Sequence, residues 1–459
     1  MNKVFLSKFV HVFNRSNVYC YYHSLNLKTI YLTQEQNSEV ISFLKNNIEP
    51  SENTDIIEVL KQNEFLILDD DEDEKQFDNV IKNNLSPQIS VGYLIISEKC
   101  NLACNYCFIK NVEKNKSKSY TLMSKSIAKR CLDVFIQQSI LCSDFTENRE
   151  LIFYGGEPLL NFEILKYVVT LYHQYQIDGR CPFKINFSVV TNGTLITNKN
   201  AIFFKENNIN VSISIDGPSI KANKNRVFLN SNKCAFSSIL NGINLLKEHK
   251  CTFGLSYTLS EDALLVPIPD LIAFLKQNLI TSISFNTLIC RDHLKKKEYY
   301  EAAANYIIEF SKEAFINHIY EDRMSRKMNA LAKRQFLYND CAATAGCQLC
   351  FYPNGNIGIC HGCKKEKLKS NWNVLSLEQI NYVKSKEFIH WLENSPIYNE
   401  KCKDCSAIGV CGGGCVINKQ ANTENKNIDL GFCIQSKKIL EFLIWYIYDC
   451  LKLDLKDNI

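Results

Sequence analysis

The spacing of hydrophobic and polar residues sets the first 88 residues apart from the rest of the chain. Short segments rich in Val, Ile and Tyr predict strands, and apolar residues at helical spacing predict two helices. The predicted strands cover residues 8–13, 18–25, 28–32 and 64–68, and the predicted helices cover 34–47 and 53–62. The acidic run Asp69–Glu74 predicts a linker or the start of a helix. Residues 1–88 are therefore expected to form a small α+β domain.

From residue 89 the pattern changes to strands that alternate with amphipathic helices, such as those expected over 124–138 and 236–248. The six strand segments are SVGYLII, ELIFYGG, KINFSVVTNG, VSISIDG, TFGLSYTL and SISFNTL. Repeated β-then-α units imply a parallel sheet covered by helices, either an open barrel or a doubly wound sheet. The informative polar residues follow strand ends, where α/β barrels place their chemistry.

Cysteine dominates the remainder of the chain. Eleven of the 21 cysteines lie at or beyond Cys341, and strand patterns are scarce after about Met324. The N-terminus has no signal-peptide pattern, so we expect a cytoplasmic protein whose thiols stay reduced and bind metal, as zinc or iron–sulfur sites. Residues 326–459 are expected to fold around metal, with a final apolar helix over 436–451.

Charge and hydropathy narrow the possible partners. The formal net charge of +4 does not argue for nucleic acid. The longest apolar stretches, such as Phe442–Tyr448, are too short to span a membrane. We therefore expect neither nucleic acid nor a membrane as a partner.

Three thiols follow the first strand of the βα region. Cys100, Cys104 and Cys107 form a C-x-x-x-C-x-x-C pattern with Tyr106 before the last cysteine. Three thiolates on one loop can hold three corners of a [4Fe–4S] cluster and leave one iron open for a small molecule, whereas zinc would normally need a fourth ligand. The pattern favours the cluster.

With this loop, the chain resembles the radical S-adenosylmethionine (SAM) enzymes over about residues 89–325. Gly155-Gly156-Glu157-Pro158, after the second strand, looks like the family motif that binds the SAM amino group. The resemblance implies a partial (β/α)6 TIM-like barrel, SAM as cofactor, and a 5′-deoxyadenosyl radical that abstracts hydrogen from substrate. It also implies SAM contacts from Tyr106 and from residues at later strand ends, namely Ser188, Thr191, Asn192, Ser214, Asp216 and Arg226, the last resembling the arginine that pairs with the SAM carboxylate.

The C-terminal cysteines are similar in spacing to the SPASM extension, and above all to that of anaerobic sulfatase-maturating enzymes, which bind two further [4Fe–4S] clusters. The resemblance assigns one ligand set, here called the first auxiliary set, to Cys341, Cys347, Cys360 and Cys415. It assigns the second auxiliary set to Cys402, Cys405, Cys411 and Cys433. With the first loop this gives three [4Fe–4S] clusters; a pair of zinc ribbons is the alternative. Cys350 and Cys363 stay unassigned.

SPASM enzymes mostly act on peptides and proteins, and two reactions compete. One is thioether or carbon–carbon cross-linking of a ribosomally made peptide; the other is oxidation of a sulfatase Cys or Ser to formylglycine. His361 stands where the sulfatase maturases have their proposed aspartate base, and it is our candidate acid–base residue, with His293 and Tyr257 as further guesses. The histidine at this position favours the peptide cross-linking reaction over sulfatase maturation.

The N-terminal 88 residues point the same way. In size, order and position they resemble the small winged-helix domains of peptide-maturing enzymes, which bind a leader peptide as an added strand; a structural cap on the barrel is the alternative. The expected partners are a peptide with a leader segment and a low-potential electron donor such as a flavodoxin or ferredoxin. The remaining alternative is a different class of protein, a non-catalytic iron–sulfur electron carrier.

Overall fold

The computed structural model describes residues 4–46, 55–84, 87–107, 121–141, 148–288, 297–362, 372–376, 381–421 and 428–457. Its N-terminal part is built on an antiparallel sheet of β2 (Val10–Arg15), β3 (Val18–His23) and β4 (Thr29–Thr33). Three helices follow: α1 (Gln34–Asn46), α2 (Asp55–Gln62) and α3 (Asp70–Lys82). The short strands β1 (Phe5–Leu6) and β5 (Leu66–Ile67) pair with each other. This part has its own buried core, which includes Val40 and Phe65.

The acidic run is a helix start. Asp69 caps α3, its side chain accepting a hydrogen bond from the Glu72 N–H. Acidic residues in the first turn also stabilise the helix, because they interact favourably with the positive end of its dipole. Of the two expectations for this run, the helix start is confirmed.

The centre of the molecule is a nine-stranded sheet in the order β12-β11-β10-β9-β8-β7-β6-β13-β14. Six of its parallel strands are β6 (Val91–Ser97), β7 (Arg149–Gly155), β8 (Ile185–Thr191), β9 (Asn210–Ile215), β10 (Phe253–Leu259) and β11 (Ser282–Thr287). These strands follow one another in chain order, without the reversal that defines a doubly wound sheet. The barrel alternative is therefore confirmed.

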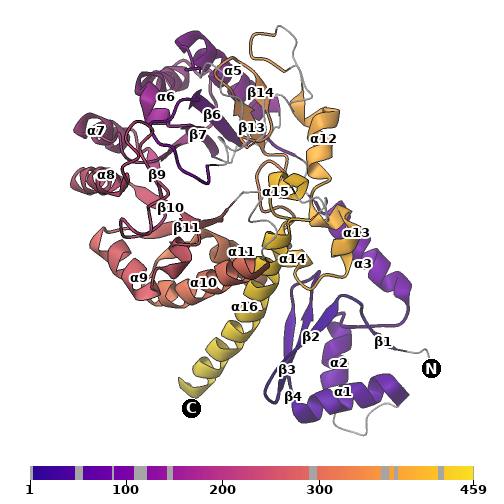
Figure 1. Ribbon diagram of the computed structural model, residues 1–459. Helices are drawn as coiled ribbons and strands as arrows, with labels where there is room; N and C mark the ends of the chain where they lie inside the picture. Colours follow the sequence, from indigo (N-terminus) through magenta and orange to yellow (C-terminus); the bar gives the residue numbers. More distant parts are fainter. Residues whose placement is uncertain are drawn as a thin grey trace.

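Helices cover the outer face of this sheet (Figure 1). They are α5 (Lys125–Leu141), α6 (Phe162–Ile177), α7 (Asn198–Glu206), α8 (Phe236–Glu248), α9 (Ile268–Gln277) and α10 (Lys297–Ile316). In β8 fully buried residues alternate with half-buried ones: Phe187 and Val189 face the helices, whereas Ser188 and Val190 face the inside of the barrel. The inside of the barrel is thus the more open side.

The cysteine-rich region is continuous with the barrel. α11 (Asp322–Lys333) runs across the boundary we expected at 325/326, following the short edge strand β12 (Tyr320–Glu321). β13 (Gln348–Phe351) pairs in parallel with β6 and forms a hairpin with β14 (Ile357–Gly358). The C-terminal part therefore extends the sheet at one edge.

Four short α-helices and one long one follow among the described residues. They are α12 (Lys386–Leu392), α13 (Glu400–Lys403), α14 (Ile408–Cys411), α15 (Val416–Ala421) and α16 (Leu430–Asp457). α16 is longer than the 436–451 predicted, and it packs against α10, α11 and α14. Among the described residues, no helix is both long enough and apolar enough to cross a membrane.

The N-terminal part docks on this cysteine-rich region (Figure 1). Phe9, Leu25 and Phe77 form a buried cluster with Ile408 of α14. The Tyr31 hydroxyl donates a hydrogen bond of 2.6 Å to the Ile444 carbonyl of α16. The N-terminal part is therefore held against the elements that carry the second auxiliary set.

Candidate radical SAM site and auxiliary cysteine sets

The loop with Cys100, Cys104 and Cys107 leaves the carboxyl end of β6. Burial raises the pKa of the Cys100 thiol to about 11, and electrostatic interactions with the Cys104 and Cys107 thiols add to this. Backbone hydrogen bonds tie the loop to the segment around Arg226: the Ala103 N–H donates to the Val227 carbonyl (2.8 Å). The structure therefore places the cysteine loop beside the predicted SAM contact Arg226.

The two glycines of the GGEP turn press directly on the residues that lead into Cys100. A Cβ on Gly155 would lie 2.0 Å from the Ser97 carbonyl oxygen, and one on Gly156 would lie 2.4 Å from that of Lys99. Gly155 also has a φ of +141°, which side-chain-bearing residues rarely adopt. The glycines are thus needed for close approach of β7 to the cysteine loop.

The Glu157 carboxylate points into the protein, where it is fully buried. It accepts hydrogen bonds from the Thr191 hydroxyl (2.6 Å), the Asn192 N–H (2.8 Å) and the Leu159 N–H (3.0 Å). Burial raises its pKa to about 7, although these hydrogen bonds favour the charged form. Glu157 therefore joins the GGEP turn, which continues into Pro158, to the end of β8.

Asn192 extends this connection to the cysteine loop. Its side-chain amide donates to the Asn101 side-chain oxygen (2.9 Å), and the Asn101 amide donates to the Thr194 hydroxyl (2.8 Å). The GGEP turn, the end of β8 and the cysteine loop thus form one hydrogen-bonded assembly.

Three other predicted SAM contacts form a second buried network. Arg226 Nε donates to Asp216 Oδ1 (2.7 Å), and the Tyr106 hydroxyl donates to Asp216 Oδ2. The Arg226 guanidinium also lies over the Tyr106 ring, 5.6 Å from its centroid, and reaches the Thr258 hydroxyl (3.2 Å). Because Asp216 is fully buried and holds both partners, it fixes the arginine beside the cysteine loop.

The two serines occupy different depths of the barrel. Ser214 lies near the end of β9, paired in register with Ser256 of β10, and both are half-buried on the inner face. Ser188 lies three residues before the end of β8, and its hydroxyl donates to Glu150 (2.9 Å) near the start of β7. Ser214 is therefore beside Asp216, whereas Ser188 is deeper in the barrel.

The first auxiliary set comes together from three separate segments. Burial raises the pKa of the Cys415 thiol to about 12, and the nearby thiols of Cys360 and Cys341 raise it further. Cys347 follows Cys341 after a tight turn and immediately precedes β13. Three of the four cysteines that the resemblance assigned to this set thus interact electrostatically, and Cys347 lies a short turn after one of them.

The four thiols of the second auxiliary set also interact with one another. Burial raises the pKa of the Cys433 thiol, and the surrounding thiols of Cys411, Cys402 and Cys405 raise it further. Within the described parts of the chain, no three His, Cys, Asp or Glu side chains converge as ligands of a single metal ion would. Thiolates are ligands of both iron–sulfur clusters and zinc, so the donor set of these cysteines fits either group.

His361 lies against the inner wall of the barrel. Its ring stacks on Tyr93 of β6 (4.5 Å between centroids, 21° between planes) and contacts Tyr154 of β7 (4.7 Å). Burial lowers its pKa to about 4, so the imidazole is neutral near pH 7. Tyr257, by contrast, is fully buried against Phe285 on the helix-facing side of the sheet.

Of the two unassigned cysteines, Cys350 is fully buried in β13 and packs with Ile95 and Tyr352. It also interacts electrostatically with Cys360. Cys363 and His293 lie outside the described residues. Cys350 is thus a packing residue that borders the first auxiliary set.

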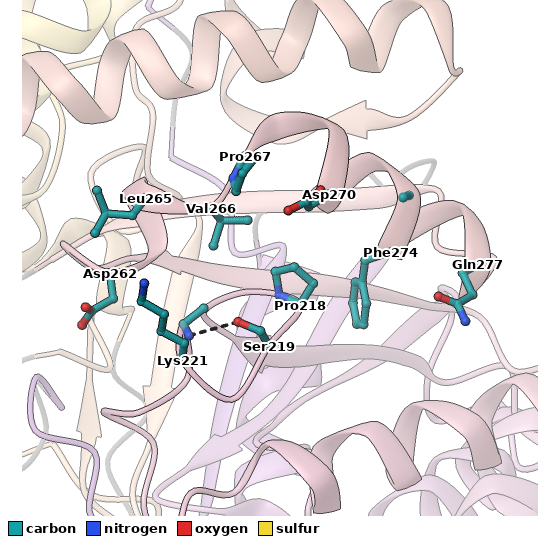
Figure 2. Close-up of a pocket in the computed structure, with 12 residues that line it drawn as sticks. Pro218, Ser219, Lys221, Asp262, Leu265, Val266, Pro267, Asp270, Phe274 and Gln277 are labelled. Carbon is teal, nitrogen blue, oxygen red and sulfur yellow. Dashed lines mark hydrogen bonds between the residues drawn. The ribbon is translucent and has the colours of Figure 1, made fainter.

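A cavity of about 460 Å³ opens beside the SAM-site residues (Figure 2). Pro218 and Ser219, which follow the SIDG segment, form one wall, and Pro267 and Phe274 at the start of and within α9 form another. Its lining contains none of the predicted SAM contacts. The cavity therefore lies outside the network of Tyr106, Asp216 and Arg226.

Sequence reasoning missed two buried lysines beside the second auxiliary set. Lys327 of α11 is 1 % exposed and Lys419 of α15 is 5 % exposed. Burial lowers the pKa of both, whereas nearby anionic groups, including Cys411 in each case, raise it. Nothing in the local sequence distinguishes them from the chain's many surface lysines.

Comparison with known proteins agrees with this geometry. Residues 94–260 match the radical SAM superfamily. A radical SAM cyclopropyl synthase, TigE of Paramaledivibacter caminithermalis, is 24% identical over 481 residues, covering 96% of each chain. A cysteine-type anaerobic sulfatase-maturating enzyme of Clostridium novyi is 24% identical over 373 residues, covering 75% of this chain and 92% of its own.

The solved structure of native anSMEcpe with bound AdoMet shares the fold, with a TM-score of 0.65 and 19% identity over 78% of this chain and 99% of that one. Residues 94–260 are therefore a radical SAM domain, and the chain is an enzyme of the radical SAM type. The superfamily implies SAM and a [4Fe–4S] cluster, and the thiol donors of Cys100, Cys104 and Cys107 fit that cluster.

Proposed function

We propose that the protein is a peptide maturase that oxidatively modifies a ribosomally made peptide, through a thioether or carbon–carbon linkage. The observation that carries the proposal is the N-terminal part, which has its own core and an antiparallel sheet of β2, β3 and β4. A leader peptide would add to an edge of this sheet as a further strand, with its backbone supplying affinity and its side chains supplying specificity.

Sequence coverage supports the same choice. The cyclopropyl synthase aligns with 96% of this chain. The sulfatase-maturating enzyme of C. novyi aligns over nearly all of its own length with only 75% of this chain. This chain thus carries an additional segment that a sulfatase maturase does without.

The chain's own residues would then divide the work as follows. Cys100, Cys104 and Cys107 hold a cluster with one open iron, and Arg226, fixed by Asp216, receives the SAM carboxylate. When bound, the cluster and SAM supply a 5′-deoxyadenosyl radical that removes hydrogen from the peptide. The inner face of the barrel, with Ser214 and Ser256, positions the peptide and excludes water.

His361 is the proposed acid–base residue. It follows Cys360 of the first auxiliary set and stacks on Tyr93 and Tyr154 at the inner wall. A neutral imidazole there can take a proton from the peptide. The two auxiliary sets would each hold a [4Fe–4S] cluster, and a flavodoxin or ferredoxin would deliver electrons.

Sulfatase maturation is the second candidate, because several relatives are named as anaerobic sulfatase-maturating enzymes. One anaerobic experiment separates the two. The reconstituted enzyme is given SAM, a reductant, and either the short peptide encoded beside its gene or a sulfatase active-site peptide. Loss of two hydrogens from the first peptide, with fragmentation blocked inside a ring, supports the proposal and identifies the joined residues. Conversion of the sulfatase Cys or Ser to an aldehyde refutes it.

A further inference from the structure

Two buried cations flank the second auxiliary set. Lys327 Nζ donates to the Val410 carbonyl (3.0 Å) and lies 4.6 Å from the centre of the Phe432 ring. Val410 and Phe432 directly precede the ligands Cys411 and Cys433. The ammonium therefore lies next to two of the four ligand positions, at the place where α11 meets α14 and α16.

Lys419 occupies a comparable position in α15. Its Nζ donates to the Asn394 carbonyl (2.7 Å), and it interacts electrostatically with Cys411, Cys402 and Cys433. The two lysines thus both interact with Cys411, from different helices.

Neither lysine forms an ion pair with a carboxylate among the described residues. Asp340, the acid nearest to Lys327, is already paired with Arg323 (2.7 Å) and Arg326 (3.0 Å). An unpaired cation is costly to bury, whereas a [4Fe–4S] cluster with four thiolates carries net negative charge. The bound cluster would therefore supply the missing anion.

The surroundings of the first auxiliary set are different. Asp340 directly precedes Cys341, and the Asp429 carboxylate accepts a hydrogen bond from the Cys415 N–H (3.0 Å). Asp429 also interacts with Cys433 and Lys419, and Asp340 interacts with Lys327, but every thiol that interacts with either lysine belongs to the second set. The cation that interacts with Cys341 of the first set is Arg323, which is paired with Asp340. Cationic surroundings favour the more negative, reduced state of a cluster, and anionic surroundings oppose it.

We infer that Lys327 and Lys419 are positioning residues that raise the reduction potential of the cluster on Cys402, Cys405, Cys411 and Cys433 above that of the cluster on the first auxiliary set. This inference rests on the proposed cofactor content but not on the identity of the peptide. It makes the second auxiliary cluster the one of the pair that is reduced first.

The test is a redox titration followed by electron paramagnetic resonance. The full chain with Cys100, Cys104 and Cys107 replaced by Ala keeps only the auxiliary clusters, and should show two reduction steps. Lys327→Met and Lys419→Met should each lower the potential of the higher step. Lys327→Arg should restore it, because the charge is kept. Lys333→Met, an exposed lysine of the same helix, should move neither step.

Potentials that stay unchanged in both Met variants, with both clusters retained, would overturn the inference alone. Should Lys327→Met fail to hold its clusters, Lys419→Met and Lys327→Arg still decide the question. A protein that binds zinc or a single auxiliary cluster would overturn the inference together with the cofactor proposal. Failure of the peptide reaction would leave the potentials, and so this test, unaffected.

Discussion

Replacing Gly156 with Ala tests how the GGEP turn supports the cysteine loop. The new methyl group would lie 2.4 Å from the Lys99 carbonyl oxygen and 2.8 Å from that of Glu98. Ordinary contacts begin near 3.4 Å, so the two backbones would have to separate by about 1 Å. Cys100 follows Lys99 directly, and it would move with it.

The size of the effect follows from this displacement. Forcing a methyl group into a packed site costs about 1–3 kcal/mol. Misplacing a reacting centre by about 1 Å can cost on the order of 100-fold in rate. We therefore expect SAM cleavage to fall about 100-fold in Gly156→Ala. If the enzyme holds the three proposed clusters, loss of the first would reduce its iron from about twelve towards about eight atoms per chain.

The assay measures iron per chain and the rate of 5′-deoxyadenosine formation under reducing, anaerobic conditions. Gly179→Ala is the matched control. Gly179, unlike Gly156, has a positive φ (+68°), but a Cβ there would meet nothing within 4 Å. It should therefore cost about 1 kcal/mol of backbone strain and leave both readouts unchanged. A Gly156→Ala enzyme with full iron content and normal SAM cleavage would refute the argument that the turn sets the loop's position.

Three further results are expected. Asp216→Asn should raise the KM for SAM about tenfold or more, because it removes the charge that holds Arg226; an unchanged KM in the 5′-deoxyadenosine assay would contradict this. His361→Ala should lower the ratio of modified peptide to 5′-deoxyadenosine at least tenfold by mass spectrometry, and an equal ratio would exclude it as the acid–base residue. Burial lowers the pKa of His23 to about 4, and its Nδ1 accepts a hydrogen bond from the Leu25 N–H (3.3 Å), so protonation opposes folding. Stability is then full above about pH 6.5 and falls by about 2 kcal/mol between pH 7 and pH 5, as measured by hydrogen exchange in β3; the same slope in His23→Phe would refute this.

Much of the fold could be predicted because its signals are local. Strand and helix patterns placed β6 to β11 and α8 within a few residues. The same patterns left an open barrel and a doubly wound sheet as alternatives, because they do not show the order in which the strands lie in the sheet. Only the spatial sequence of the strands decides between them.

The cysteine sets could be anticipated because ligand spacing carries its own information. Cys415 joins Cys360 and Cys341 although about 55 residues or more separate it from them, as the resemblance implied. The role of Glu157 was harder to anticipate. Its motif implied contact with the SAM amino group, whereas its carboxylate is occupied by Thr191 and Asn192.

The docking position of the N-terminal part could not be predicted. The pattern of residues 1–88 predicts a separate domain, but it contains no signal for where that domain docks. In the structure, a Cβ on Gly409 would lie 2.4 Å from the Ser24 carbonyl oxygen, so the turn after β3 rests directly on α14. Because α14 ends at Cys411, the proposed leader-binding sheet and the second auxiliary set share a packed boundary. Packed boundaries shift between discrete arrangements rather than deform continuously. A strand added to this sheet would therefore shift α14, and with it the proposed cluster ligand Cys411.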